Sequence, residues 1–262
     1  MRGKTPLERM LEDAWREPGL RPAFYKRLLE SEILVAVQPT HGQGQGGRID
    51  AGSILQCICL MRRDGVQVMP FYTSPERVFE GSPRGEKCVL MTTRELFKSR
   101  PDMTFHLNPF SRYGREFNPH EVVLLLETGT LDCSGKELVL DEEQIELAAP
   151  KNPPHELLNA LSVLFARNFQ IRTAFAADLI RPNKAIEKTL LIGIELTSER
   201  ERIFREAATV VNDFIVPELA VDLVAIERDD SRVSKYFFGE ATPFYRIGLA
   251  AAIASASAHS EP

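Results

Sequence analysis

The chain has 262 residues and a net charge of −5, with 44% hydrophobic and 26% charged residues. This length favours two domains, and the composition is that of an ordinary globular protein with enough apolar residues for a core. The acidic balance argues against a nucleic-acid binder, and no apolar run reaches the length of a membrane span. The first residues lack the apolar stretch of a secretory signal, so we expect a cytoplasmic protein that does not associate with membranes.

The first half of the chain alternates strands with helices. Thr5-Pro6-Leu7-Glu8 predicts a helix that starts with a capping box, followed by a strip of apolar residues at helical spacing. This strip, the predicted buried side of the helix, contains Leu7, Met10, Leu11, Ala14 and Trp15. A second helix over 22–31 and a strand over 33–37 follow. Residues 38–50 are rich in glycine and glutamine but lack the Gly-Lys-Ser/Thr ending of a phosphate-binding loop, which favours a flexible hairpin loop over a ligand loop.

Residues 53–63 (SILQCICLMRR) are apolar on both faces, and this pattern predicts a central strand. Asp64-Gly65 suits a two-residue hairpin turn, and 66–71 returns as the partner strand. Thr73-Ser74-Pro75-Glu76 then predicts a helix whose first amides are capped by a hydroxyl. Two more capping boxes, at 92–95 and 118–121, each predict a helix that follows a strand or loop.

The second half follows a linker over 128–136. We expect a helix after Asn152-Pro153-Pro154, a half-exposed strand over 171–179 and a central strand over 189–196. Ser198–Glu201 predicts another capped helix, 221–226 a strand, and Asp230-Ser231 a short helix. The predicted fold is therefore α+β, with two domains that each contain a mixed or antiparallel sheet covered by helices. The expected domains are 1–134 and 135–250, followed by a disordered tail over 251–262.

Sequence motifs for catalysis or metal binding are missing from the chain. The five histidines do not show the spacing of a metal-ligand pair, and no CxxC occurs among the four cysteines. Cys57 and Cys59 lie in an apolar run, where a low thiol pKa is not expected, and Cys133 lies in the linker. We therefore expect no catalytic residues, no metal and no cofactor. A thiol-dependent enzyme or sulfur carrier that uses Cys57 or Cys133 stays open as an alternative.

The segment Leu107–Asn118 (LNPFSRYGREFN) combines aromatic residues, arginines and a glycine in a predicted loop. Scaffolded loops of this composition are typical of recognition sites. The alternative is that Phe110 and Phe117 anchor the loop in the core while Asn108 forms a turn. A second candidate is the strand-to-helix corner at 70–76, where helix-start amides could accept an anion. Together the two segments supply the predicted binding residues: Phe71, Thr73, Ser74, Asn108, Phe110, Arg112 and Tyr113.

Short motifs in both halves resemble those of SseB, the enhanced-serine-sensitivity protein family. In the first half they are Phe24-Tyr25 with Leu28–Ser31, Asp64-Gly65 with Met69–Ser74, and Leu107–Ser111 with Gly114. In the second half they are Ala149-Pro150 with Pro153-Pro154, Leu191–Glu195 and Pro243–Tyr245. The resemblance implies a link to serine sensitivity and amino-acid metabolism, but it implies no reaction. Related first-half domains accompany secretion and bacterial-competition proteins, which implies a binding module.

Three hypotheses about function follow. The first is a cytoplasmic, non-enzymatic protein that binds an unidentified protein partner and acts in regulation. The second is a sensor of a small metabolite such as an amino acid, bound between the domains or at the helix-start corner. The third is the thiol-dependent enzyme or sulfur carrier. Edge strands of either sheet could also pair in a homodimer.

Overall fold

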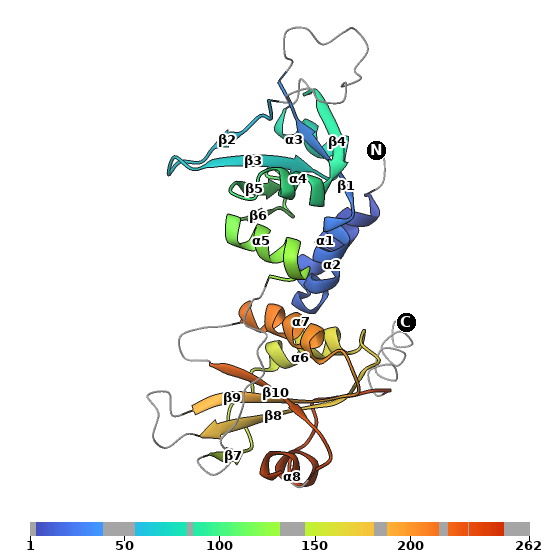
Figure 1. The fold of residues 1–262 in the computed structure, drawn as a ribbon, viewed down its shortest axis with the longest axis vertical. Coiled ribbons are helices and arrows are strands. Elements are labelled where there is room, and N and C mark those ends of the chain that lie inside the picture. The colour runs from blue at the N-terminus through green and yellow to red at the C-terminus, as the bar shows by residue number, and fades with distance from the viewer. Residues whose placement is uncertain are drawn as a thin grey trace, which may run out of the picture. The chain divides into compact units, whose positions relative to one another are not determined.

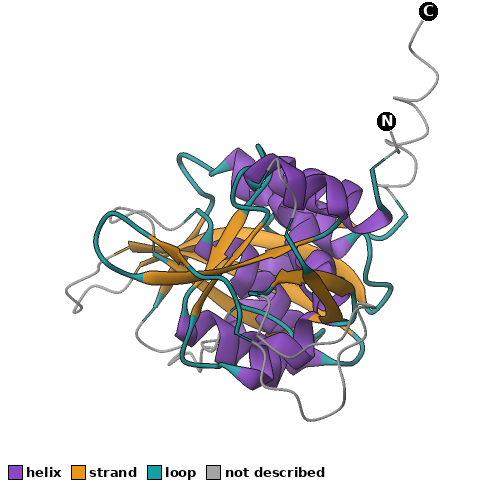
Figure 2. Ribbon diagram, turned by 90° about the horizontal axis from the view of Figure 1, so that it is seen from above, coloured by secondary structure: helices purple, strands orange, loops and turns teal. Residues whose placement is uncertain are grey.

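The computed structural model describes residues 4–38, 56–82, 86–131, 145–180, 188–214, 220–229 and 231–248. The chain forms two compact units, one of residues 1–16 and 23–131 and the other of residues 17–22 and 132–262. Helices and strands occur in both units, which confirms the predicted α+β class (Figures 1 and 2). The predicted domain boundary after residue 134 and the predicted tail from residue 251 lie outside the described residues.

The first unit is built on a mixed sheet. Its strand order is β4-β1-β3-β5-β6, and β2 also pairs with β3. The strands are β1 (Glu32–Ala36), β2 (Leu60–Met61), β3 (Gln67–Tyr72), β4 (Cys88–Thr92), β5 (Thr104–Leu107) and β6 (Arg115–Phe117). β3 runs parallel to β5 and antiparallel to β1. β3 is buried from Val68 to Tyr72 and lies at the centre of this sheet.

Helices cover both faces of this sheet. They are α1 (Pro6–Arg16), α2 (Arg21–Leu29), α3 (Pro75–Gly81), α4 (Thr93–Ser99) and α5 (Pro119–Thr128). On one face, buried aromatic rings from α2, α4 and three strands pack with adjacent centroids 4.9–6.3 Å apart, from Tyr25, Phe71, Phe97, Phe105 and Phe117. On the other face, Val78 of α3 packs in a cluster with Ala36 and Tyr72. The predicted capping boxes at Thr92 and Asn118 are confirmed.

The predicted central strand over 53–63 is wrong. Within the described part of this segment, β2 has only two residues, and Cys57 forms an isolated bridge to Val37. Met61 is 64% exposed, so the segment is not covered on both faces. The return strand β3 takes the central place instead, because β1 and β5 flank it. The hairpin turn has three residues rather than two: the Arg62 N–H donates to the Val66 carbonyl at 2.9 Å, and Gly65 has a φ of +85°.

The second unit contains another mixed sheet. Its order is β10-β9-β8-β11, and β7 pairs with β8. The strands are β7 (Glu146–Ala148), β8 (Ile171–Ile180), β9 (Lys188–Leu196), β10 (Val221–Ile226) and β11 (Tyr245–Arg246). Only the β9–β10 pair is parallel among the described strands of this sheet. β9 lies between β8 and β10, which confirms the predicted central strand over 189–196.

Helices also cover both faces of the second sheet. α6 (His155–Phe165) and α7 (Arg200–Asn212) form one core with residues such as Ala174 of β8. α8 (Arg232–Gly239) forms a second core on the opposite face, where Phe237 packs with Phe175. The predicted half-exposed strand over 171–179 is therefore wrong, because α6 and α7 cover the face of Ala174 and Ala176, which was expected to meet solvent. No described helix is long and apolar enough to cross a membrane.

The start of α7 also differs from the prediction. Glu199 is the residue before the helix, with a left-handed φ of +55°, and no side chain caps the first amides. The Glu199 carboxylate instead accepts hydrogen bonds from Arg202 and from the Gln170 side chain. A capping box at Ser198–Glu201 is therefore absent, because its expected first residue does not reach the helix amides.

Replacing Gly193 by alanine should destabilise the second unit. An added Cβ would lie 2.7 Å from the ring of Phe237, a fully buried residue of α8 that also packs on Phe175. Overpacking of this kind typically costs about 1–3 kcal/mol. Urea or thermal denaturation of the full chain should show this loss of unfolding free energy.

Gly239→Ala is the matched control, because a Cβ at this position meets no atom within 4 Å. Its stability should be unchanged or increase by up to about 1 kcal/mol. Equal stabilities of the two variants would contradict the close packing of Phe237 on β9.

Candidate recognition site

The site lies at the carboxyl ends of β3 and β5. Because these strands are parallel, with Phe71 beside Leu107, the residues that follow them come together. The Asn108 N–H donates to the Phe71 carbonyl at 2.9 Å. The Asn108 side chain then holds Thr73 twice: its Oδ1 accepts from the Thr73 N–H at 3.1 Å, and its Nδ2 donates to Thr73 Oγ1 at 3.0 Å. The two predicted binding segments are therefore one connected structure.

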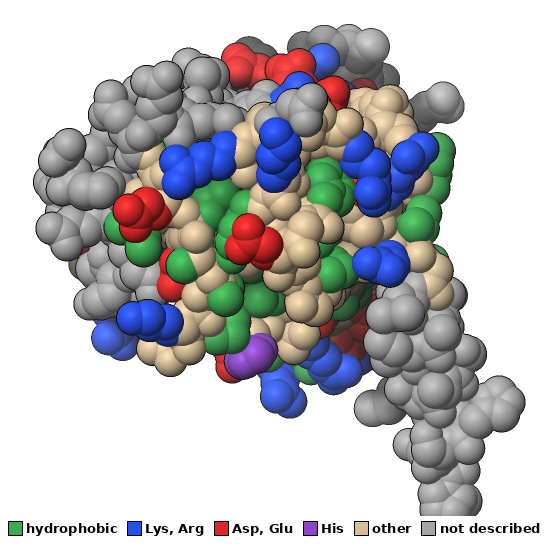
Figure 3. All heavy atoms as spheres, turned by 90° about the horizontal axis from the view of Figure 1, so that it is seen from below, with side chains coloured by type: hydrophobic (Ala, Val, Ile, Leu, Met, Phe, Trp, Pro, Cys, Tyr) green, Lys and Arg blue, Asp and Glu red, His purple; other side chains and the backbone are tan. Residues whose placement is uncertain are grey.

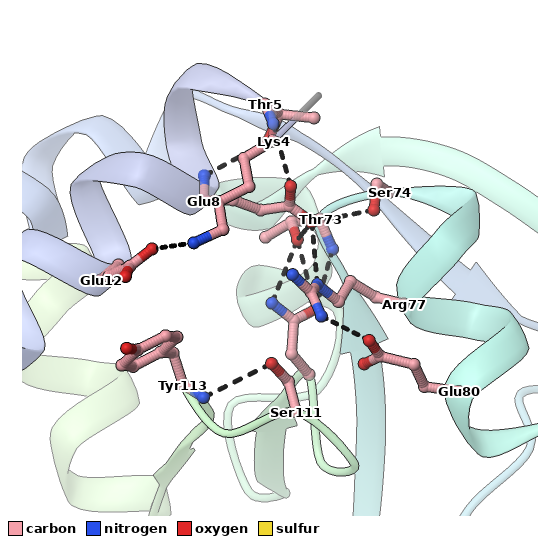
Figure 4. Close-up of polar contacts among 11 residues, drawn as sticks. Lys4, Thr5, Glu8, Glu12, Thr73, Ser74, Arg77, Glu80, Ser111 and Tyr113 are labelled. Carbon is pink, nitrogen blue, oxygen red and sulfur yellow. Dashed lines mark hydrogen bonds and ion pairs between the residues drawn. The ribbon is translucent and has the colours of Figure 1, made fainter. Parts of the chain in front are cut away.

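A buried carboxylate from α1 completes this connection (Figure 4). Glu8 Oε2 accepts the Thr5 N–H at 2.9 Å, which confirms the predicted capping box of α1. Glu8 Oε1 accepts hydrogen bonds from Thr73 Oγ1 at 3.0 Å and Ser74 Oγ at 2.9 Å, and it forms an ion pair with Arg77 Nε at 3.0 Å. The carboxylate thus joins α1 to the start of α3.

Two opposing effects determine the pKa of Glu8: burial and the hydrogen bonds that the carboxylate accepts. Burial by itself raises the pKa of this carboxyl, since a charge is disfavoured away from water. The hydrogen bonds from Thr5, Ser74, Thr73 and Arg77 together outweigh burial, so the pKa of Glu8 is lowered from its usual 4.5. Glu8 therefore stays ionised at neutral pH although it is only 7% exposed.

The start of α3 is not capped as predicted. Ser74 occupies the N-cap position, but neither its hydroxyl nor another side chain bonds the first amides of the helix. The hydroxyls of Thr73 and Ser74 point to Glu8 instead. A hydrogen bond donated to an ionised carboxylate is strong, so the contact with α1 sets the orientation of these hydroxyls.

The segment Asn108–Gly114, called the recognition loop below, leaves this network and crosses to solvent. Asn108 has a φ of +47°, a conformation that asparagine tolerates better than most residues. The Ser111 N–H donates to the Asn108 carbonyl at 3.0 Å, and the Tyr113 N–H donates to Ser111 Oγ at 3.4 Å. The loop backbone is thus fixed at its base and by internal bonds.

Tyr113 connects the recognition loop to α1. Its ring packs edge-on against Trp15 at a centroid distance of 5.6 Å, and its hydroxyl accepts from Arg16 at 3.2 Å. The cationic groups of Lys4, Arg16 and Arg112 lie 5.5–5.9 Å from the ring centroid. Glu12 pairs with Lys4 and Arg16, and the bond from Lys4 is the main reason that the pKa of Glu12 is lowered.

Phe110 connects the other side of the recognition loop to α3. Its ring lies directly over Gly81, where a Cβ would come within 2.3 Å of two ring atoms. The Phe110 ring nevertheless remains 51% exposed, as does Trp15, and Arg112, two residues after Phe110, is exposed too. We call Trp15, Arg16, Phe110, Arg112 and Tyr113 the aromatic–arginine surface.

The seven predicted binding residues divide into two groups. Phe71, Ser74 and Asn108 are buried and Thr73 is partly buried, so these four support the loop from below. Phe110, Arg112 and Tyr113 reach the surface. Phe117 is fully buried, so the anchoring role considered for both phenylalanines holds for Phe117, whereas Phe110 packs on α3 and stays half exposed.

Sequence reasoning missed four residues of the site: Glu8, Trp15, Arg16 and Arg77. The sequence predicts Glu8 only in the capping box of its own helix and Trp15 on the buried side of that helix, and it predicts no role for the two arginines. A signal was present, because Glu8, Glu12 and Trp15 recur at spacings of four and three and so share one helix face. That face is polar and aromatic, and it differs from the face of Leu7, Leu11 and Ala14, which is buried.

The described residues contain little that supports chemistry at this site. Burial raises the pKa of the Cys57, Cys59 and Cys88 thiols, which lowers their thiolate fraction and their reactivity at neutral pH. Cys133 lies outside the described residues. Burial also lowers the pKa of His106, against the opposing effect of Glu116. No cluster of three or more His, Cys, Asp or Glu side chains suited to a metal occurs in the described part of the chain.

The fold and the site define a two-unit α+β protein in which a buried polar network supports an exposed aromatic–arginine surface. The SseB protein N-terminal domain family matches residues 7–123, and the SseB protein C-terminal domain family matches residues 139–246. The chain is 31% identical over 242 residues to Protein SseB of Escherichia coli (strain K12) and, equally, to Protein SseB of Shigella flexneri, with 92% of each chain covered. The chain therefore belongs to the SseB family, as its motifs indicated. No solved structure matches it.

Glu8→Gln should destabilise the first unit. The neutral amide loses the ion pair with Arg77, and its NH2 group can no longer accept the hydrogen bonds made to the oxygen it replaces: the Thr5 N–H at Oε2 or the two hydroxyls at Oε1. Leaving buried partners unsatisfied should cost about 2–4 kcal/mol in unfolding free energy. Glu76→Gln is the control: Glu76 is an exposed carboxylate in the first turn of α3, and its loss should cost less than about 1 kcal/mol.

The same pair of proteins should show a defined pH dependence. Because the native pKa of Glu8 is below 4.5, its charge stabilises the fold fully above the unfolded pKa, and this contribution declines as the pH falls through the native value. The stability difference between the wild type and Glu8→Gln should therefore be largest near pH 7 and shrink in the acid range. A difference that stays constant down to pH 3 would exclude the carboxylate charge as its source.

Proposed function

We propose that this chain is a non-enzymatic protein-binding or regulatory protein, linked to serine sensitivity and amino-acid metabolism, that recognises a protein partner through the aromatic–arginine surface. The observation that carries the proposal is the fixed backbone beneath that surface. Asn108 is 2% exposed and bonds both Thr73 and Phe71, so the recognition loop begins at a position with no freedom to rearrange. The membership in the SseB family supports the link to amino-acid metabolism.

The residue types on this surface favour protein recognition. Tryptophan, tyrosine and arginine are the residues that most often dominate the energy of protein interfaces, because each buries a large area and can also form hydrogen bonds. Here Trp15 and Tyr113 contact each other, and Phe110 is held on α3. A surface that is already ordered loses little conformational entropy on binding, which increases the affinity gained per contact.

Removing the exposed side chains should therefore weaken partner binding without unfolding the chain. The double variant Phe110→Ala/Arg112→Ala removes an aromatic and a cation but leaves the buried network in place. We expect affinity for the partner to fall at least about tenfold. Capture from a native extract on immobilised full-length chain, quantified by mass spectrometry, identifies the partner.

The control is Phe169→Ala/Arg172→Ala, which removes an exposed aromatic residue and an exposed arginine from the second unit. It should retain the partner. Trp15 provides a direct readout with the purified partner, because it is the single tryptophan of the chain and its fluorescence should change when the surface is covered. A partner set that is identical for the wild type and the Phe110→Ala/Arg112→Ala variant would refute this surface as the binding site.

A second function, the sensing of a small metabolite, is favoured by one cavity. A cavity of about 440 Å³ lies between β7 and α8 in the second unit. Its lining is mixed in chemistry, with apolar, cationic, aromatic and acidic groups from Ile145, Leu147, Arg232, Lys235, Tyr236 and Glu240. Figure 3 views the molecule from the side of α8, where apolar side chains lie among Lys and Arg side chains. Such a lining suits a zwitterion, with Glu240 facing the ammonium group and Ile145 the side chain.

A thermal-shift screen over the amino acids tests this second function. One amino acid should raise the melting temperature in a saturable manner, and Tyr236→Ala or Glu240→Gln should reduce the shift. Glu227→Gln is the control, since Glu227 is an exposed carboxylate of the same unit that does not line the cavity. If no amino acid shifts the melting temperature, protein binding remains as the function of the chain.

The third hypothesis, a thiol-dependent enzyme or sulfur carrier, gains no support from the three described cysteines. Burial raises their pKa rather than lowering it, and a reactive thiol needs the opposite shift. For Cys133, mapping thiol reactivity in the native protein remains the direct test. Uniformly slow labelling of all cysteines would remove this hypothesis.

A further inference from the structure

Among the described strands, the edge strand β4 of the first sheet is paired on one side alone. It stands at the end of the strand order, and β1 is its partner there. The bonds from the Thr93 N–H to the Ser31 carbonyl and from the Val37 N–H to the Lys87 carbonyl show that the odd-numbered residues of β4 face β1. The backbone groups of the even-numbered residues Cys88, Leu90 and Thr92 therefore point away from β1, because the pattern alternates in an antiparallel pair.

The side chain at the centre of this edge is apolar and exposed. Leu90 is 60% exposed and lies beside Leu34, which in turn lies beside Tyr72. These three side chains form a row across the face of the sheet that α3 covers. The row ends at Leu90 on the edge strand. A further strand beside β4 would continue this row with another apolar side chain.

β4 also lacks the features that normally protect an edge strand. Natural edges carry charged residues, prolines or bulges that prevent pairing with another chain. The sequence of β4, CVLMT, contains none of these. The other described edge strands of three or more residues carry a charge, as in β6 (Arg115 and Glu116), β7 (Glu146) and β10 (Asp222).

We propose that two copies of this chain form a homodimer by antiparallel pairing of β4 with β4 about a two-fold axis at Leu90. Each Leu90 N–H would donate to the Leu90 carbonyl of the other copy, and each Cys88 N–H to the Thr92 carbonyl. Thr92 donates its own N–H to Glu95, so it serves here as an acceptor. The two Leu90 side chains would meet on the same face and shield each other.

The charges that flank β4 favour a second copy as the occupant. In a register centred on Leu90, the residues before β4 of one copy lie near the start of α4 of the other, where β4 has ended. Glu86 and Arg94 flank β4 at these two ends of the edge. Glu86 accepts from Ser82 Oγ at 2.8 Å, and Arg94 pairs with Glu30 at 2.5 Å. The two-fold axis therefore brings opposite charges together at both ends and neutral residues at the centre.

The oligomeric state of the full-length chain tests the proposal. Sedimentation velocity over a range of protein concentrations should show a monomer–dimer equilibrium for the wild type. Leu90→Lys places two like charges opposite each other at the axis and should raise the dissociation constant at least about tenfold. Val123→Lys, at an exposed apolar residue of α5, is the control and should dimerise as the wild type does.

A charge exchange tests the register. Glu86→Arg should weaken the dimer, and Glu86→Arg/Arg94→Glu should restore it, because the double variant again brings opposite charges together. A wild type that stays monomeric at every concentration would overturn the proposal. So would a dimer that persists in Leu90→Lys, or one that Val123→Lys disrupts equally.

Discussion

The ionised carboxylate of Glu8 is the interaction on which the arrangement of the first unit depends. One oxygen closes the start of α1, and the other accepts hydrogen bonds and an ion pair from the corner between β3 and α3. A charge at 7% exposure is stable only if its partners replace water, and here two hydroxyls, one amide and one guanidinium do so. α1 is thereby fixed on the corner by directional bonds as well as by its apolar side.

The recognition loop is held in place by the same hydrogen-bond network. Thr73 forms hydrogen bonds with both Glu8 and Asn108, so this one residue connects α1 to the base of the loop. The loop then returns to α1 through Tyr113, which packs on Trp15 and accepts from Arg16. α1 therefore holds the loop from two ends, by buried polar bonds at Asn108 and by an exposed aromatic contact at Tyr113. This double attachment explains how exposed aromatic side chains can keep one geometry at the surface.

The parts of the fold that the sequence predicted correctly are those determined by near neighbours. The capping boxes at Thr5, Thr92 and Asn118 involve residues three apart, so the motif contains all the necessary information. The Glu8 network could not be predicted in this way, because its partners lie 65 to 69 residues along the chain. The centre of the sheet was misplaced for a similar reason. Both strands of the hairpin are apolar, and only the positions of β1 and β5 decide which of them is enclosed.

The hydrogen bonds that the Thr73 and Ser74 hydroxyls donate to Glu8 affect what this site can bind. Had they capped α3, they would have occupied its first amides themselves. Instead they converge on an anion supplied by the chain itself, and the guanidinium of Arg77 is paired with it as well. A second anion at this corner would meet the charge of Glu8 at short range in a poorly solvated place, where like charges repel strongly. The corner is therefore suited to supporting the loop rather than to binding an anion.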